Sequence, residues 1–313
     1  MAHQTKPFDT WQPCKELIHD HYMQAMRASE DGKPLLWAGA AAPPELVRAM
    51  DIVPIWGEPY GAICSDAQLI ELSEACDDVG YSRNICAYSR MVIGSLLKNK
   101  GPYGSFPMPS VVMAEKNACH AQVKWWEQVA RLCRAPLFVL DTPMVYGELE
   151  EHHVEYYVGQ LWDMKDFLEK HTGRRLEEGK LIEAVVRARR CTEQWDQVME
   201  FMKARPCPMS FKTLYTFYVP VISMRGTPEA NEFYDRLISE LADRVAHGIA
   251  AVPQERVRLL WEGMPLWHRL DLIKWLEEKG AVFVNNTYVA AWGEFYRRFP
   301  NHGRPGSPAQ EWH

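Results

Sequence analysis

Short apolar runs alternate with amphipathic stretches over residues 34–143, and this alternation limits the possible folds more than any other feature of the chain. Helical spacing of apolar residues follows each of the first runs along the chain. Strands that alternate with helices form parallel sheets that helices cover. The sequence therefore predicts an α/β fold with a parallel sheet in this region. The runs read "PLLWAG", "DIVPIW", "PSVVMAEK" and "APLFVLDTP".

A second, shorter alternation starts after residue 252, with "RVRLLWEGMP" and "AVFVNN" as predicted strands around one predicted helix. Long helical patterns without strands separate the two alternations. We therefore expect two parallel-sheet α/β units flanked by helices, with a long helical segment between them and the second unit incomplete. The predicted parts are an N-terminal helix, a first α/β domain, a helical segment and the start of a second α/β domain, at residues 1–30, 31–147, 148–252 and 253–313.

Composition and charge exclude several classes of function. The formal net charge of the 313 residues is −6 and no block of basic residues occurs, so a nucleic-acid partner is not expected. No apolar run reaches 18 residues and the N-terminus lacks the pattern of a signal peptide, so we expect a soluble, cytoplasmic protein without a membrane partner. Neither a GxxxxGK[ST] phosphate loop nor a GxGxxG fingerprint is present.

Two of the eight cysteines have a distinctive context. Cys86 in "YSRNICAYSRMVIG" and Cys119 in "AEKNACHAQVKWWE" each precede a predicted helix. Cys119 also follows a predicted strand, as does Glu58, and ligands of parallel sheets bind at the carboxyl ends of strands. Cysteine pairs of the CxxC type are absent. Taken alone, these residues could be buried thiols, a disulfide or part of a metal site, and the disulfide is disfavoured in a reducing compartment.

Several motifs in order resemble one known superfamily over roughly residues 30–300. They are "WAGAAAPPELVRAMDIVPIWGEP", "CAYSR", "NACHAQVKWWE" and "VRLLWEGMPLWHRLDLIKWLEEKGAVFVNNTYVAAWG". Their arrangement resembles the 2-hydroxyacyl-CoA dehydratase and benzoyl-CoA reductase superfamily, and the later motifs look more like the reductase branch. The resemblance implies an anaerobic iron–sulfur subunit that acts on an acyl-CoA thioester, with reduction of an aromatic acyl group favoured and dehydration of a 2-hydroxyacyl-CoA as the alternative.

The same resemblance implies a cofactor and partner proteins. Cys86 and Cys119 would be two ligands of a [4Fe–4S] cluster, for which thiolates are the usual ligands. A related iron–sulfur subunit would complete the enzyme as a heteromer. A separate activator protein would hydrolyse ATP and donate the electrons, which agrees with the missing phosphate loop. Ser89 and His120 lie beside the two cysteines and are candidates for hydrogen bonds around the cofactor.

Proton transfer in either reaction requires an acid or a base. Glu58, in the expected loop "WGEPYG", and Glu45, in "PPEL", are the candidates. A glutamate at a helix start also interacts favourably with the helix dipole, and this structural interpretation is the stronger one for Glu45.

The chain departs from the superfamily pattern at the third cluster ligand. Cys133, Cys191 and Cys207 do not stand in a matching context, and valine occupies position 289 in "NNTYVAAW". The chain would then be a fragment or a shortened relative. Two further interpretations remain open: a cluster-free subunit that stabilises a catalytic partner, and an unrelated α/β protein whose cysteines belong to the core.

Overall fold

The four apolar runs of the first alternation form one parallel sheet in the computed structural model, which describes residues 3–116 and 119–293. The strand order is β2-β1-β3-β4. The central strands β1 and β3 are buried along their whole length, so helices must cover both faces of the sheet. The strands are β1 (Leu35–Ala38), β2 (Val53–Trp56), β3 (Val111–Glu115) and β4 (Leu137–Leu140).

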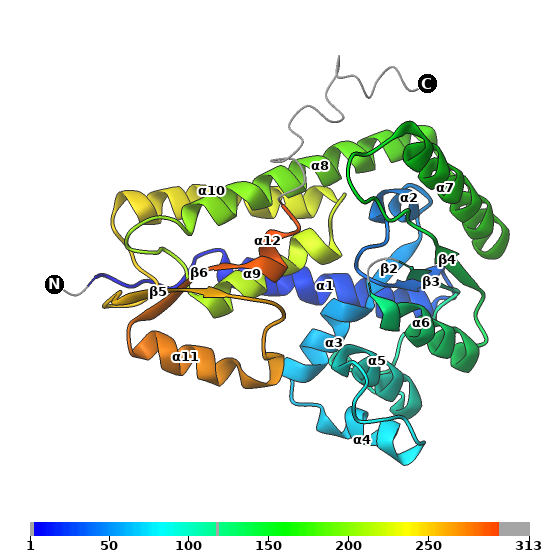
Figure 1. Cartoon of the computed structure of the whole chain (residues 1–313), viewed down its shortest axis with the longest axis horizontal. Helices are drawn as coiled ribbons and strands as arrows, with labels where there is room; N and C mark the ends of the chain where they lie inside the picture. The colour runs from blue at the N-terminus through cyan, green and yellow to red at the C-terminus, as the bar shows by residue number, and fades with distance from the viewer. Residues whose placement is uncertain (1–2, 117–118, 294–313) are drawn as a thin grey trace. The chain divides into compact units, whose positions relative to one another are not determined.

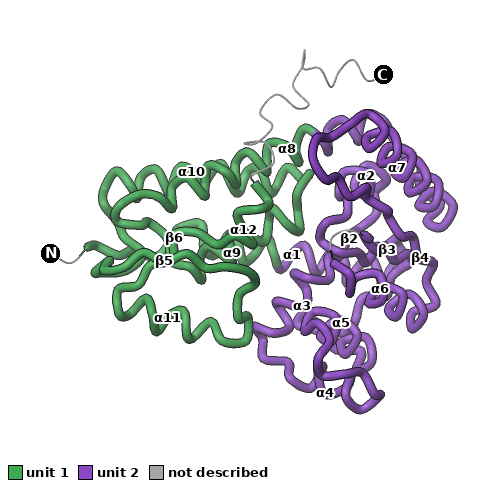
Figure 2. Tube along the Cα trace, viewed as in Figure 1, with its two compact units in different colours: residues 1–18, 186–313 green, residues 19–185 purple. Residues whose placement is uncertain are grey.

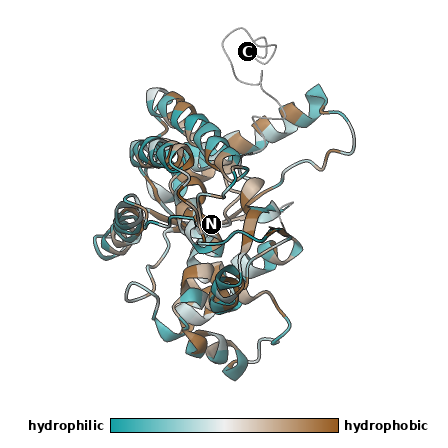
Figure 3. Cartoon of the chain, turned by 90° about the vertical axis from the view of Figure 1, so that its left-hand side faces the viewer, coloured by the Kyte–Doolittle hydropathy of each residue, from teal (hydrophilic) through white to brown (hydrophobic). Residues whose placement is uncertain are grey.

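Helices that arise from the amphipathic stretches cover this sheet. In Figure 1, α2 and α6 lie on opposite faces of it. α6 packs against β3 and β4, while α2 contacts β2. Figure 3 shows hydrophobic and hydrophilic residues on the same helices, as expected where one side of a helix faces the core. The helices are α1 (Trp11–Glu30), α2 (Pro44–Ala49), α3 (Gly57–Asp66), α4 (Ile70–Asp78), α5 (Ala87–Lys98), α6 (His120–Cys133) and α7 (Glu151–Thr172).

At the centre of the sheet, the direction in which successive strands are added reverses. β1 leads through α2 to β2 on one side, whereas β3 leads through α6 to β4 on the other side. β1 and β3 are neighbours, so their connections leave in opposite directions. Such a switch point opens a crevice at the carboxyl ends of the two strands, which is where open α/β sheets bind ligands.

Aromatic packing fixes α3 and α6 on one face of the sheet. The Trp37 ring on β1 lies 6.4 Å from that of Trp126 on α6 and 4.9 Å from that of Tyr60 on α3. It also stacks on Phe106 at 4.7 Å, and its indole N–H donates to the Pro107 carbonyl at 2.8 Å. Burial of each large side chain contributes about 1.5–3 kcal/mol to stability. The N-termini of α3 and α6 are therefore held against the carboxyl end of the sheet.

The structure divides into two compact units (Figure 2). Unit 2, residues 19–185, holds the four-stranded sheet and includes the first α/β domain predicted over residues 31–147. Unit 1 comprises residues 1–18 and 186–313. The boundaries between the units fall inside α1 and α8.

Unit 1 contains most of α8, all of α9 and α10, and the second parallel sheet. β5 pairs with β6 in parallel, with an irregularity between Leu259 and Leu260. This confirms a second α/β unit with a small parallel sheet. The end of its predicted range, residues 294–313, lies outside the described residues. The elements are α8 (Glu178–Phe201), α9 (Phe211–Ser223), α10 (Pro228–Ala246), β5 (Val257–Trp261), the 3-10 helix η1 (Trp267–Arg269), α11 (Leu270–Glu278), β6 (Ala281–Asn286) and α12 (Thr287–Ala290).

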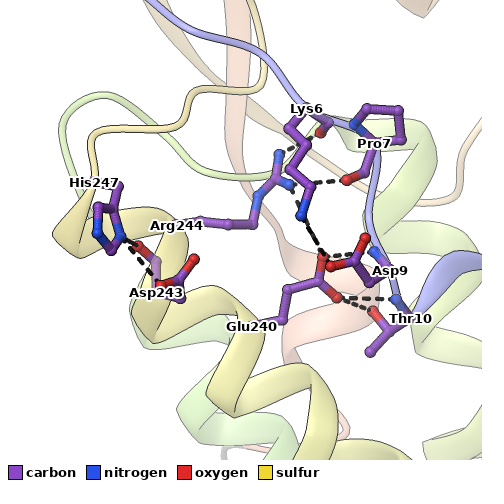
Figure 4. Close-up of polar contacts among 8 residues, drawn as sticks. All are labelled: Lys6, Pro7, Asp9, Thr10, Glu240, Asp243, Arg244 and His247. Carbon is purple, nitrogen blue, oxygen red and sulfur yellow. Dashed lines mark hydrogen bonds and ion pairs between the residues drawn. The ribbon is translucent and has the colours of Figure 1, made fainter.

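Side chains of α10 hold the segment before α1 (Figure 4). The Glu240 carboxylate accepts hydrogen bonds from the backbone N–H of Asp9 at 2.7 Å and of Thr10 at 2.9 Å. The buried Arg244 guanidinium donates to the carbonyl of Lys6 at 2.9 Å and stacks over the Phe8 ring at 3.8 Å. These polar groups thus satisfy one another in a structural role.

In the part of the chain that the structure describes, no helix is both long and apolar enough to cross a membrane.

A buried histidine on α1 makes the stability of unit 2 sensitive to acid. The His21 ring is 7% exposed, and its Nε2 has no hydrogen-bond partner among the described residues. Burial, and secondarily the charge of Arg48, lowers its pKa from 6.5 to about 3. Below pH 6.5, the unfolded chain therefore binds a proton at His21 that the native state does not bind. The contribution of His21 to the free energy of unfolding is complete above pH 6.5 and decreases as the pH falls toward 3.

We expect His21→Phe to remove about 1.4 kcal/mol per pH unit of the acid-induced loss in the free energy of unfolding below pH 6.5. Urea denaturation at pH 7 and pH 5 measures this, with the solvent-exposed His19, replaced by Phe in the same way, as the control on the same helix. An equal pH dependence in the wild type and His21→Phe would contradict the expectation.

Candidate functional site

Glu58 lies in the first turn of α3, so the expectation of a loop at "WGEPYG" was wrong. The helix begins at Gly57, immediately after β2. Proline is tolerated in a first helical turn because that turn leaves its N–H groups unpaired in any case, so Pro59 does not prevent the helix. The Glu58 carboxylate is also favoured at the positive end of the helix dipole.

The Glu58 carboxyl group connects three elements at the carboxyl edge of the sheet. Its Oε2 accepts a hydrogen bond from the backbone N–H of Ala40, just after β1, at 2.9 Å. Its Oε1 accepts from Nε2 of Gln122, in the first turn of α6. The residue as a whole keeps intermediate solvent exposure. Burial of the carboxyl group raises the pKa of Glu58 to about 7, although the N–H groups of Glu58 itself, Ala40 and Gln122 oppose the rise.

A carboxyl group with a pKa near 7 exchanges protons in both directions at neutral pH. General acid–base catalysis is most effective when the pKa of the catalytic group lies near the working pH. Perturbed pKa values of this kind are concentrated at functional sites. Glu58 therefore has the properties of a catalytic acid or base.

A second carboxyl group, that of Glu115, lies beside the first. Glu115 is the last residue of β3 and is 2% exposed, and neither of its carboxyl oxygens has a hydrogen-bond partner among the described residues. Burial, followed by the charge of Glu58, holds the pKa of Glu115 well above its usual range, while its own backbone N–H opposes the rise. An ionised Glu58 therefore disfavours ionisation of Glu115.

These groups gather at the switch point of the sheet. Gly39 and Ala40 follow β1, and Glu115 ends β3. A methyl group built on Gly39 would lie 2.2 Å from Oε2 of Glu115 and 2.5 Å from Oε1 of Gln122, so only glycine leaves space for both oxygens. The residues Gly39, Ala40, Glu58, Glu115 and Gln122 are called the carboxyl cluster below.

Both distinctive cysteines occupy the N-cap positions of helices. Cys119 is exposed at the start of α6, and Cys86 is half-exposed at the start of α5. Both carry free thiols, and α5 and α6 pack against each other. The N-terminus of a helix favours an anionic group such as a thiolate. The Cys119 carbonyl accepts the backbone N–H of Gln122 at 3.1 Å, which joins this cysteine to the carboxyl cluster through the first turn of α6.

The three other residues named from the sequence, Ser89, His120 and Glu45, are not members of the carboxyl cluster. The buried Ser89 donates its hydroxyl hydrogen to the Cys86 carbonyl at 2.7 Å, so it fixes the backbone of that cysteine. His120 is exposed as the first residue of α6. Glu45 is half-buried in the first turn of α2, and it is not among the groups that shift the pKa of Glu58.

The two N-cap cysteines suit an iron–sulfur cluster in ligand type but do not form a complete ligand set. Cys133, at the opposite end of α6, is half-buried, and burial raises its pKa to about 11. Over residues 3–116 and 119–293, no three or more His, Cys, Asp or Glu side chains gather in a way that could hold a metal ion. The remaining cysteines are buried, as expected of core residues: Cys14, Cys64, Cys76, Cys191 and Cys207.

Glu115 and Gln122 were not predicted as site residues from the sequence. Glu115 ends the apolar run "SVVMAE", and a charged residue directly after buried strand positions was the available signal. Gln122 is a neutral residue in an amphipathic helix, where nothing local distinguishes it.

Comparison with known proteins identifies relatives over most of the chain. The profile of the family described as "2-hydroxyglutaryl-CoA dehydratase, D-component" matches residues 40–309. The alpha subunit of (R)-2-hydroxyisocaproyl-CoA dehydratase from Clostridioides difficile is 28% identical over 287 residues, which cover 90% of this chain and 70% of the relative. The alpha subunit of (R)-2-hydroxyglutaryl-CoA dehydratase from Acidaminococcus fermentans is 23% identical, and the match covers 91% of this chain and 76% of the relative.

A relative from the reductase branch matches less of the chain. A benzoyl-CoA reductase subunit from Thauera aromatica is 25% identical over 241 residues, which cover 72% of this chain and 56% of the relative. The comparisons therefore confirm the superfamily that the motifs resemble. They support the dehydratase alternative better than the reductase branch, which the later motifs had favoured.

Proposed function

Because the chain belongs to the 2-hydroxyglutaryl-CoA dehydratase D-component family, we propose that it is a subunit of an enzyme that removes water from a 2-hydroxyacyl-CoA thioester. The observation that carries the proposal is the Glu58 carboxyl group, which has a pKa near 7 and lies at the switch point of the sheet. The relatives that match about nine-tenths of this chain are dehydratase alpha subunits, which supports the same assignment.

Dehydration of this substrate requires a proton to leave carbon 3 and the hydroxyl group to leave carbon 2 of the acyl chain. The products are the 2-enoyl-CoA and one water molecule, so the proton and the hydroxide balance. In the proposal, ionised Glu58 accepts the carbon-3 proton. The N–H groups of Ala40 and Gln122 hold the carboxylate in place for this step.

We further propose that Cys86 and Cys119 are two ligands of a [4Fe–4S] cluster. The accessible thiols and their positions at helix N-termini support this role. When bound, such a cluster supplies low-potential electrons that weaken the bonds next to the thioester carbonyl. Ser89 and His120 are proposed to orient the ligand backbone and to donate hydrogen bonds around the site.

Two protein partners would complete the proposed enzyme. The two dehydratase relatives named above are alpha subunits, which supports a related second subunit for this chain. Electrons would come from an ATP-hydrolysing activator, because this sequence has no phosphate loop of its own.

Assays with the assembled enzyme test the proposed function. The chain, its partner subunit, an activator, ATP and a strong reductant are combined without oxygen and offered a panel of (R)-2-hydroxyacyl-CoA thioesters or benzoyl-CoA. We expect formation of a 2-enoyl-CoA and no reduction of benzoyl-CoA. Reduction of benzoyl-CoA alone would move the chain to the reductase branch, and turnover of neither thioester would refute both assignments.

A second candidate function is a cluster-free subunit that stabilises a catalytic partner. The specific observation in its favour is the incomplete cysteine set at α5 and α6 within the described residues. Stoichiometric iron and acid-labile sulfide in the isolated, anaerobically purified chain would exclude this candidate.

A further inference from the structure

The two polar atoms of the Gln122 amide differ: the nitrogen Nε2 has a hydrogen-bond partner, whereas the oxygen Oε1 has none within the described residues. Its Nε2 donates to Oε1 of Glu58. Its Oε1 therefore points away from Glu58, is buried, and accepts no hydrogen bond within the described residues. A buried acceptor without a donor destabilises the folded state, so native proteins rarely leave one.

The structure offers Glu115 as a candidate for the missing donor. Oε2 of Glu115 and Oε1 of Gln122 face the same point in front of the Gly39 Cα, at 2.2 and 2.5 Å from where a methyl group would be. Oε2 of Glu115 also has no partner within the described residues. An ionised Glu115 would place two acceptors against each other. A neutral carboxylic acid has one O–H, which is the donor that Gln122 Oε1 requires.

We propose that Glu115 is a positioning residue which, as a neutral carboxylic acid, donates its hydrogen to Gln122 Oε1 and so holds the Gln122 amide with Nε2 toward Glu58. This inference rests on the proposed function for its role in catalysis. Glu58 keeps partial solvent exposure and can reach a substrate, whereas the 2% exposed Glu115 cannot. The two carboxyl groups therefore have different roles: Glu58 exchanges protons, and Glu115 retains its proton.

The charged groups around the pair agree with this assignment. Burial and the Glu58 carboxylate both hold the pKa of Glu115 above its usual range, and the other carboxyl-cluster contacts come from uncharged backbone N–H groups and the Gln122 amide. No cation contributes to the pKa shift of either carboxyl group within the described residues. Neutral Glu115 beside ionised Glu58 therefore gives both the nitrogen and the oxygen of the amide a hydrogen-bond partner.

The first test needs no catalytic activity. Native Glu115 keeps a proton that the unfolded chain releases above pH 4.5, so its contribution to stability decreases as the pH rises above that value. Glu115→Gln is isosteric, donates from an N–H in place of the O–H, and does not titrate. We expect the urea midpoint of Glu115→Gln to rise relative to that of the wild type between pH 5 and pH 8. A difference that does not change with pH would overturn the proposal.

The second test compares a donor with a non-donor at position 115 in the assembled enzyme. We expect Glu115→Gln to retain kcat within about threefold, whereas Glu115→Leu lowers kcat about ten- to a hundredfold with little change in KM. Gln122→Met should lower kcat by a similar factor, and the double variant Glu115→Leu with Gln122→Met should be no worse than either alone, because both act through one amide.

The outcomes separate this inference from the proposed function. Equal loss in Glu115→Gln and Glu115→Leu would show that an ionisable Glu115 is required and would overturn the positioning role. A loss of kcat in the double variant that equals the product of the two single losses would also overturn the positioning role. If the wild-type assembly dehydrates no 2-hydroxyacyl-CoA, the proposed function fails, and the denaturation experiment alone decides whether Glu115 is neutral.

Discussion

Glu58→Gln is expected to lower kcat for 2-hydroxyacyl-CoA dehydration about 10²–10⁴-fold, the usual contribution of general acid–base catalysis. The amide keeps the size of the side chain but cannot accept a proton at neutral pH. KM should change little, because substrate binding does not depend on that proton. Steady-state kinetics of the assembled enzyme measure both values.

The pH profile makes this prediction specific. Ionised Glu58 is the active form in the proposed step, so the rate of the wild type should rise with pH through about 7 and then level off. This limb should be absent from the residual activity of Glu58→Gln. Glu71→Gln is the matched control, because Glu71 is also a glutamate in a first helical turn, at the more exposed start of α4. Glu45→Gln decides between the two carboxyl groups named from the sequence, and a larger loss there than in Glu58→Gln would contradict the assignment.

Cys86→Ser and Cys119→Ser are each expected to abolish bound iron and dehydratase activity. The wild type should contain about four iron and four sulfide ions per chain after anaerobic purification, as a [4Fe–4S] cluster requires. Serine preserves the shape of the side chain but is a poor ligand for iron in such clusters. Colorimetric iron and sulfide determination, together with the visible absorption of the cluster, measures the outcome.

Cys133→Ser is the matched control for this experiment. Cys133 ends the same helix that Cys119 begins, and its thiol has intermediate exposure. We expect its substitution to leave the iron content unchanged. Iron retained by both N-cap variants would refute the ligand assignment, whereas no iron in any of the four proteins would favour the cluster-free subunit.

Most of the fold could be predicted from the sequence because strands and helices leave local patterns of apolar residues. Each predicted apolar run became a strand, and β1 and β3 are buried along their whole length, as expected of short runs without polar positions in a parallel sheet. The alternation with helices then required parallel pairing. The start of α3 was missed because Gly57 and Pro59 suggest a loop, and only the packing of Tyr60 against Trp37 favours a helix there.

The site was accessible only in part because its central contacts are not local. The position of Glu58 after a strand was a sufficient reason to name it. Glu115 and Gln122 acquire their roles only once β1 and β3 are known to be neighbours and α6 is known to pack on that edge. Strand order cannot be inferred from a local sequence pattern, so Glu115 could not be distinguished from the other residues of a buried strand.

The spacing of Cys119 and Gln122 on one helix limits how this segment can change during evolution. The two residues are three positions apart: Cys119 is a proposed cluster ligand, and Gln122 donates a hydrogen bond to Glu58. Each residue of an α-helix turns about 100° around the axis, so a single insertion between them would carry the amide away from Glu58 while leaving the cysteine in place. Substitutions can accumulate along the outer side of α6, but insertions and deletions in its first turn should be absent from every functional homologue.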